Sequence, residues 1–136
     1  MGAFVKHTKS SGGCTGWPLC NGAWIPELTG ATRIVFIHRI GALLLFILIA
    51  MVAYYIAKEG NGMNIKDDKN IMASQARHVS RWALYLVCFQ VLSGAFVTFS
   101  IGTDWYLTAG MVHALTIACL FGALCYLGHL VRSPKT

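Results

Sequence analysis

Two histidines stand within long apolar stretches of this sequence, and they are its best candidates for chemistry. His38 lies in IVFIHRIGALLLF, and His113 begins HALTIACLFGALCY. An ionisable side chain inside a membrane helix is costly, so by default it marks a functional site that faces other helices. A neutral imidazole is a good metal ligand, and two imidazoles can occupy both axial positions of one haem iron.

The apolar stretches that hold these histidines predict three transmembrane helices. Residues 34–57, 82–101 and 107–131 are each long enough to cross about 30 Å of hydrocarbon at a rise of about 1.5 Å per residue. Of the 136 residues, 56% are hydrophobic and only 12% are charged, which leaves too little polar surface for a soluble domain of this size. We therefore predict an all-α membrane protein.

The polar connections predict how the chain crosses the lipid bilayer of the cell membrane. Residues 58–81 and 132–136 together hold more basic side chains than the rest of the chain. Because basic residues favour the cytoplasmic side, we expect these two segments to be cytoplasmic. Residues 1–33 and the 102–106 turn are then extracytoplasmic. The basic residues expected on the cytoplasmic side are Lys58, Lys66, Lys69, Arg77, Arg81, Arg132 and Lys135, and the others are Lys6, Lys9, Arg33 and Arg39. Because these charges flank apolar runs, the net charge of +6 indicates topology and no nucleic-acid partner.

The predicted helices place the two histidines at similar depths. His38 and His113 lie about 6 and 9 Å inside the expected outer ends of their helices, a difference of less than one turn. Both helices run in the same direction, so the two imidazoles can face each other and bind one haem iron. The alternative is that each histidine only forms a hydrogen bond to a neighbouring helix or faces water near the interface.

Other polar residues have plainer interpretations. His129 lies about 24 Å beyond His113 along the same helix, so it cannot bind the same iron. His78 and His129 are the alternative pair for a second haem, but ordinary solvated side chains are the simpler interpretation. For Arg39, beside His38, we expect a partner in either a haem propionate or the lipid headgroups.

Cys14 and Cys20 bracket the short sequence TGWPL, whose Gly and Pro allow the chain to fold back on itself. On the extracytoplasmic side, such a pair is expected to form a disulfide. The alternative is two free thiols. Metal ligation is disfavoured because the sequence has no second pair of cysteines nearby.

Taken together, GAFVKHTKSSGGCTGWPLCNG, IVFIHRIGALLLF, LSGAF and HALTIACLFGALCY resemble haem A synthase, the membrane enzyme that oxidises a methyl group of haem O to a formyl. That family is built from two similar four-helix halves, and the resemblance is closer to the C-terminal half, which binds haem b through two histidines. His38 and His113 fall on those ligand positions. The catalytic half has a Glu three residues before its first histidine, where this chain has Val35, so we assign no catalytic residue.

The resemblance implies that this chain provides most of one antiparallel four-helix bundle half, as an apparent truncation. A missing N-terminal half, or another copy of the chain, would complete the bundle, and the short apolar GAFV at the start is consistent with a preceding helix. The family's extracytoplasmic cysteines are proposed to act in redox chemistry. The alternative function is a stand-alone b-type cytochrome that serves as a membrane electron carrier or anchor, and the sequence identifies no electron-transfer partner in either case.

Overall fold

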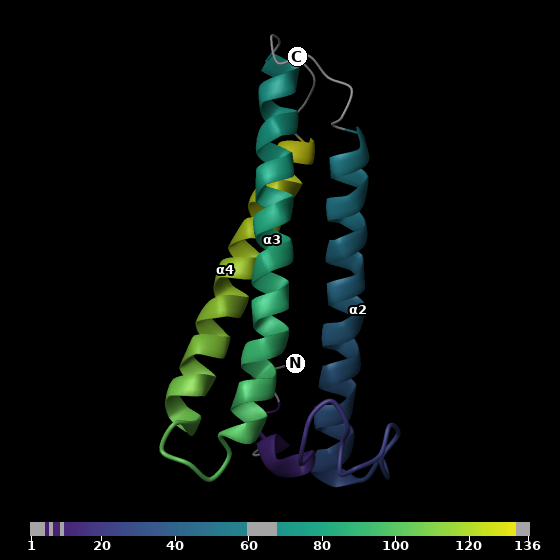
Figure 1. Ribbon diagram of the computed structural model, residues 1–136, viewed down its shortest axis with the longest axis vertical. Helices are drawn as coiled ribbons and strands as arrows, with labels where there is room; N and C mark the ends of the chain where they lie inside the picture. The colour runs from purple at the N-terminus through teal and green to yellow at the C-terminus, as the bar shows by residue number, and fades with distance from the viewer. Residues whose placement is uncertain (1–4, 6, 9, 60–67, 133–136) are drawn as a thin grey trace. The chain divides into compact units, whose positions relative to one another are not determined.

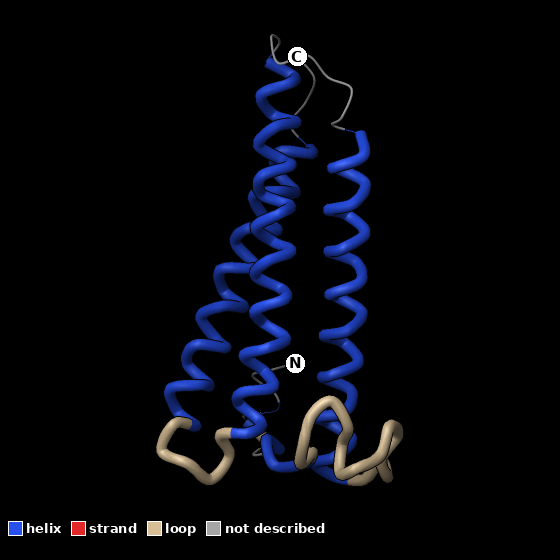
Figure 2. The backbone as a smooth tube through the Cα atoms, viewed as in Figure 1, coloured by secondary structure: helices blue, strands red, loops and turns tan. Residues whose placement is uncertain are grey.

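A computed structural model describes residues 5, 7, 8, 10–59 and 68–132 of the chain. Their main elements are a short 3₁₀-helix η1 (Ser10–Gly13) and three long α-helices, α2 (Gly30–Glu59), α3 (Asp68–Phe99) and α4 (Tyr106–Arg132) (Figure 1). Helices and loops account for all of the described chain in Figure 2. The prediction of an all-α protein is therefore confirmed.

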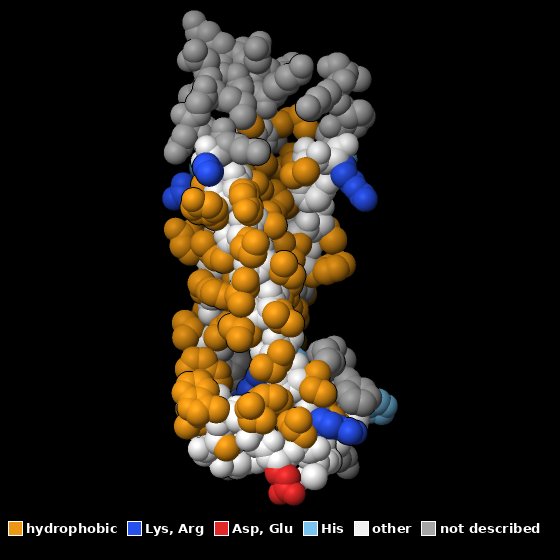
Figure 3. All heavy atoms as spheres, turned by 90° about the vertical axis from the view of Figure 1, so that its right-hand side faces the viewer, with side chains coloured by type: hydrophobic (Ala, Val, Ile, Leu, Met, Phe, Trp, Pro, Cys, Tyr) orange, Lys and Arg blue, Asp and Glu red, His pale blue; other side chains and the backbone are white. Residues whose placement is uncertain are grey.

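All three long helices are apolar and long enough to span a membrane. The candidate spans are Gly30–Lys58, Ile71–Phe99 and Tyr106–Arg132, and only 11, 22 and 17% of their most apolar stretches is buried within the protein. Hydrophobic side chains cover the visible middle stretches of the helices, with Lys and Arg towards the ends (Figure 3). Such exposed apolar surface is stable in lipid and not in water, so the chain is a multi-pass membrane protein.

The helices extend beyond the segments expected from hydropathy. The helix α2 starts at Gly30 instead of residue 34, and α3 starts at Asp68 instead of residue 82. Much of the expected 58–81 loop is therefore helical. The additional turns of α3 are polar, and they carry exposed His78 and Arg81. Hydropathy detects the part of a helix that crosses the hydrocarbon, whereas the helix itself continues for as long as its backbone hydrogen bonds can form.

The chain divides into two compact units, which we describe separately. The second unit comprises Phe46–Gln90 and Leu115–Thr136. Its core is formed by one buried residue of α2, Ile49, two of α3, Ala83 and Val87, and one of α4, Leu120. Ala83 is fully buried, and a small side chain at this position allows helices to pack closely, as is common in membranes.

The first unit comprises Met1–Leu45 and Val91–Ala114, and it contains the expected disulfide between Cys14 and Cys20. Both cysteines are buried, at 0 and 2% exposure, and they pack with Val35 of α2 in a small apolar cluster. The disulfide loop is thus attached to the first turns of α2.

A tight turn follows the disulfide loop. Cys20 and Ala23 exchange two backbone hydrogen bonds of 3.0 and 3.1 Å, and Asn21 and Gly22 between them have positive φ values of 55° and 79°. Asn and Gly tolerate this conformation, which is typical of two-residue hairpin turns. The Asn21 Oδ1 atom also accepts hydrogen bonds from the backbone N–H and hydroxyl of Thr15, so the turn is tied back to the start of the loop.

The turn between α3 and α4 fixes the register of these two helices in the first unit. The Ser100 N–H and hydroxyl both donate to the Phe96 carbonyl, and the Thr103 N–H and hydroxyl both donate to the Ser100 carbonyl. The Tyr106 N–H then donates to the Thr103 carbonyl. Because these hydrogen bonds close the turn within a few residues, positions equally distant from it on α3 and α4 lie at the same level.

Gly13 provides a test of how tightly the disulfide loop packs. A Cβ atom at this position would collide with the Ala31 carbonyl group and the Thr32 nitrogen of α2, all of them backbone atoms that cannot rotate away. We expect Gly13→Ala to displace the loop and to lower the free energy of unfolding by about 1–3 kcal/mol. Thermal unfolding of the purified protein in detergent measures this change. Gly12→Ala is the matched control, because its Cβ would meet no atom within 4 Å, and equal destabilisation of both variants would contradict the tight packing.

Candidate functional site

His113 lies on α4 in the first unit, and its ring is held by two consecutive residues of α3. Its Nδ1 atom is 2.9 Å from the hydroxyl oxygen of Ser93, which is buried. A Cβ atom at Gly94 would come within 3.2 Å of the His113 Cε1 atom, so the imidazole packs against the α3 backbone at this position. These contacts restrict both the position and the rotation of the ring.

The register of the α3–α4 turn explains why these residues meet. Ser93 lies six residues before Phe99, the last residue of α3, and His113 lies seven residues after Tyr106, the first residue of α4. The sequence analysis did not identify Ser93. Ser93 could have been found as a hydroxyl side chain in the apolar LSGAF stretch, because it lies at nearly the same distance as His113 from the predicted short turn.

His38 lies on α2 in the same unit, and it is half-buried. It stands eight residues after Gly30, the first residue of α2, whereas His113 stands seven residues after the first residue of α4. These offsets correspond to about 12 and 10.5 Å along the two helices, so they differ by about one residue rise. The expected depths differed by two residues, and the observed helix starts make the offsets more nearly equal.

A glycine stands one helical turn from each histidine. Gly41 follows His38 by three residues, and Gly110 precedes His113 by three. A Cβ atom at either glycine would meet no atom within 4 Å. Each imidazole therefore has open helix surface beside it on its own helix.

Arg39 contacts the disulfide loop, a partner that the sequence analysis did not name. Its guanidinium donates hydrogen bonds to the backbone carbonyl oxygens of Gly16 at 2.9 Å, Leu19 at 3.1 Å and Pro18 at 3.5 Å. Carbonyl acceptors supplied by the protein reduce the cost of holding a charge within a membrane helix.

The other two histidines named in the sequence analysis, and three further cysteines, are exposed. His78 and His129 are exposed and belong to the second unit. Cys88, Cys119 and Cys125 are free thiols on exposed faces of their helices. Within the described ranges, no three His, Cys, Asp or Glu side chains gather to form a metal-binding group.

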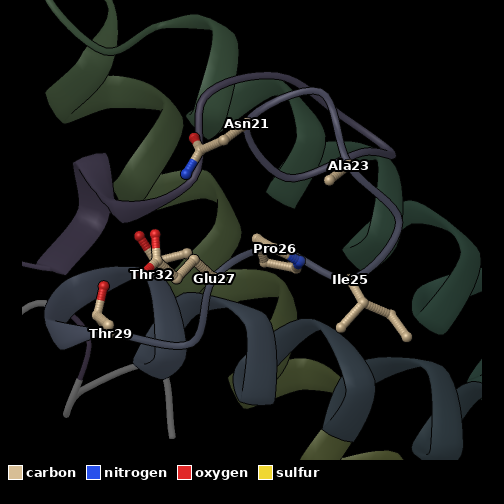
Figure 4. Close-up of a pocket in the computed structure, with 7 residues that line it drawn as sticks. All are labelled: Asn21, Ala23, Ile25, Pro26, Glu27, Thr29 and Thr32. Atoms are coloured by element: carbon tan, nitrogen blue, oxygen red, sulfur yellow. The ribbon is translucent and has the colours of Figure 1, made fainter.

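A pocket of about 340 Å³ lies in the loop that leads into α2 (Figure 4). Asn21, Glu27, Thr29 and Thr32 contribute its polar side chains, and Ala23, Ile25 and Pro26 complete it. Neither His38 nor His113 lines this pocket. The histidine pair and the pocket are therefore different features of the first unit.

Sequence comparison finds relatives along almost the whole chain. The "Heme A synthase" of Shouchella clausii is 36% identical over 136 residues, covering 98% of this chain and 41% of the relative. The "Heme A synthase" of Symbiobacterium thermophilum is 38% identical over 130 residues, covering 96% of this chain and 38% of the relative. That of Bacillus licheniformis is 34% identical over 129 residues, covering 92% and 37%.

No family model matches the chain, and no solved structure matches it either. The curated relatives nevertheless agree in name, and the match extends through the disulfide loop and all three long helices. The chain spans about two fifths of the length of these relatives. By this homology, the chain is similar to haem A synthases along nearly all of its own length.

Proposed function

We propose that this chain is the haem b-binding C-terminal half of a haem A synthase, with His38 and His113 as the two axial ligands of the iron. The observation that carries the proposal is that His113 is held in a fixed orientation on a membrane helix by Ser93 and Gly94, in the same unit as His38. If His113 served only to form a hydrogen bond to α3, no second histidine would be needed at a matching position on another helix, where His38 stands.

The Ser93 contact supports a role for His113 as a ligand. A metal-binding imidazole commonly donates its second ring N–H to an oxygen acceptor, which fixes its tautomer and raises its basicity. We assign the iron bond to Nε2, because Nδ1 is engaged by Ser93. In that state Nδ1 would be protonated, and its N–H would donate a hydrogen bond to the Ser93 hydroxyl oxygen.

The residues around both histidines are compatible with a flat macrocycle. The open surface at Gly41 and Gly110 leaves space on each helix one turn from the imidazole. A haem held by His38 and His113 would supply one-electron transfer. The chain's own contribution would be to hold the two imidazoles, to exclude water with apolar helices and, through Ser93, to keep the His113 ring in its ligating tautomer.

The resemblance to haem A synthase implies that the whole protein oxidises a methyl group of haem O to a formyl. We place that chemistry outside this chain, because Val35 stands three residues before His38 and cannot transfer a proton. A second half, or another copy of the chain, would complete the protein, and the Cys14–Cys20 loop would face the extracytoplasmic side.

The histidine assignment predicts the haem content of three variants. His38→Ala and His113→Ala should each lower the haem retained after purification at least about tenfold, because one lost axial bond leaves a weakly held macrocycle. The pyridine haemochrome spectrum of detergent-purified protein measures this. His129→Ala, on the exposed face of α4 in the second unit, is the control and should retain its haem. Equal haem content in all three variants would rule out the pair.

The activity assignment predicts that this chain works only as part of a longer protein. Expressed alone in cells that make haem O but lack a synthase, it should yield no haem A. A chimera in which it replaces the matching 136 residues of the Shouchella clausii relative should restore haem A, measured by chromatography of extracted haems.

The chimera with His38→Ala is the matched control, and it should lose that activity. Haem A from the chain alone would contradict the assignment of catalysis to the other half. A chimera that binds haem but forms no haem A would favour the alternative b-type cytochrome.

A further inference from the structure

Arg39 forms a set of hydrogen bonds that the proposed haem site does not require. Its two terminal nitrogens reach the carbonyl oxygens of Gly16 and Leu19 at 2.9 and 3.1 Å, and that of Pro18 at 3.5 Å. All three acceptors lie within the ring closed by the Cys14–Cys20 disulfide. A planar guanidinium suits this arrangement, because it presents several N–H donors in a fixed fork.

The disulfide itself packs one turn earlier on the same helix. Cys14 and Cys20 are buried against Val35, and Val35 and Arg39 are four residues apart, so they share one face of α2. The loop therefore rests on α2 at two points, one apolar and one charged. His38 lies between these two points in the sequence.

We infer that Arg39 is a positioning residue that holds the disulfide loop as a cap on α2 beside His38, and that this cap limits the access of water to the haem proposed above. The inference rests on the proposed function for its haem. It assigns Arg39 to the loop and not to a haem propionate. The closed disulfide shortens the loop so that three of its carbonyls can converge on one guanidinium.

Two consequences follow from this arrangement. A haem shielded from water has a higher reduction potential, because burial disfavours the more highly charged ferric form. The cap and the haem are also coupled in both directions. If the loop stabilises the haem site, then bound haem must stabilise the closed loop by the same free energy.

The first test follows the loop without any haem. The two cysteines are almost inaccessible, so a reductant reaches the disulfide only when the loop opens. In the haem-free protein, we expect Arg39→Lys and Arg39→Gln to speed reduction of the disulfide about tenfold, the effect of losing hydrogen bonds to a charged group. Mass-tagging of the released thiols after timed exposure to a phosphine measures this rate. Arg33→Gln, an exposed arginine on the same helix, is the control and should not change it.

The second test measures the reduction potential of the bound haem by redox titration. Arg39→Gln removes both the positive charge and the guanidinium N–H donors, whereas Arg39→Lys removes the guanidinium but keeps the charge. If Arg39 acts through the cap, both variants shift the potential downwards, and so does Cys14→Ser/Cys20→Ser, which keeps Arg39 but opens the ring. The shifts of Arg39→Lys and the double cysteine variant should then be non-additive when combined, because both remove the same cap.

The outcomes separate the inference from the function on which it rests. A wild-type protein that binds no haem would overturn the proposed function, and the thiol-release rates would still decide whether Arg39 holds the loop. With haem bound, a wild-type potential in Arg39→Lys together with a lowered one in Arg39→Gln would show a pure charge effect and overturn the cap. Unchanged thiol-release rates in both Arg39 variants would overturn it as well.

Discussion

The contact between Ser93 and His113 is the interaction on which the proposed site depends most. A polar ring within an apolar helix needs a partner inside the protein, because lipid supplies none. The partner here is available only because the turn from Ser100 to Tyr106 is closed by its own hydrogen bonds, which bring Ser93 and His113 to the same level. Gly94 then lets the imidazole approach the α3 backbone closely. The turn thus sets the register of the two helices, and the register sets the orientation of the His113 ring.

The same constraint explains the N-terminal end of α2. Arg39 lies nine residues after Gly30 on a helix that can span the membrane, and loop carbonyls act as its hydrogen-bond acceptors. The loop can supply them because its two cysteines are joined and buried on Val35. A disulfide, an apolar contact and a charged hydrogen-bond network therefore stabilise one another. They do so at the helix face next to the histidine that we propose as a haem ligand.

Much of this structure could be predicted from the sequence, and what was missed has a physical reason. Length and apolarity were sufficient for the three helices, and the spacing of Cys14 and Cys20 was sufficient for the disulfide. The early start of α3 at Asp68 was missed because polar turns outside the hydrocarbon have no hydropathy signal. The partners of Arg39 and His113 were missed because each lies twenty or more residues away in sequence, so they depend on how a loop or a turn folds.

The central claim is that His38 and His113 share one iron. Pulsed EPR of the ferric, haem-loaded protein with isotopically labelled histidine tests this claim directly, because the couplings of axial imidazole nitrogens to the iron can be counted. We expect a low-spin signal with two axial imidazoles, and each of His38→Ala and His113→Ala should reduce that number to one or abolish the signal. A wild-type signal from one imidazole, or two imidazoles that persist in either variant, would contradict the account.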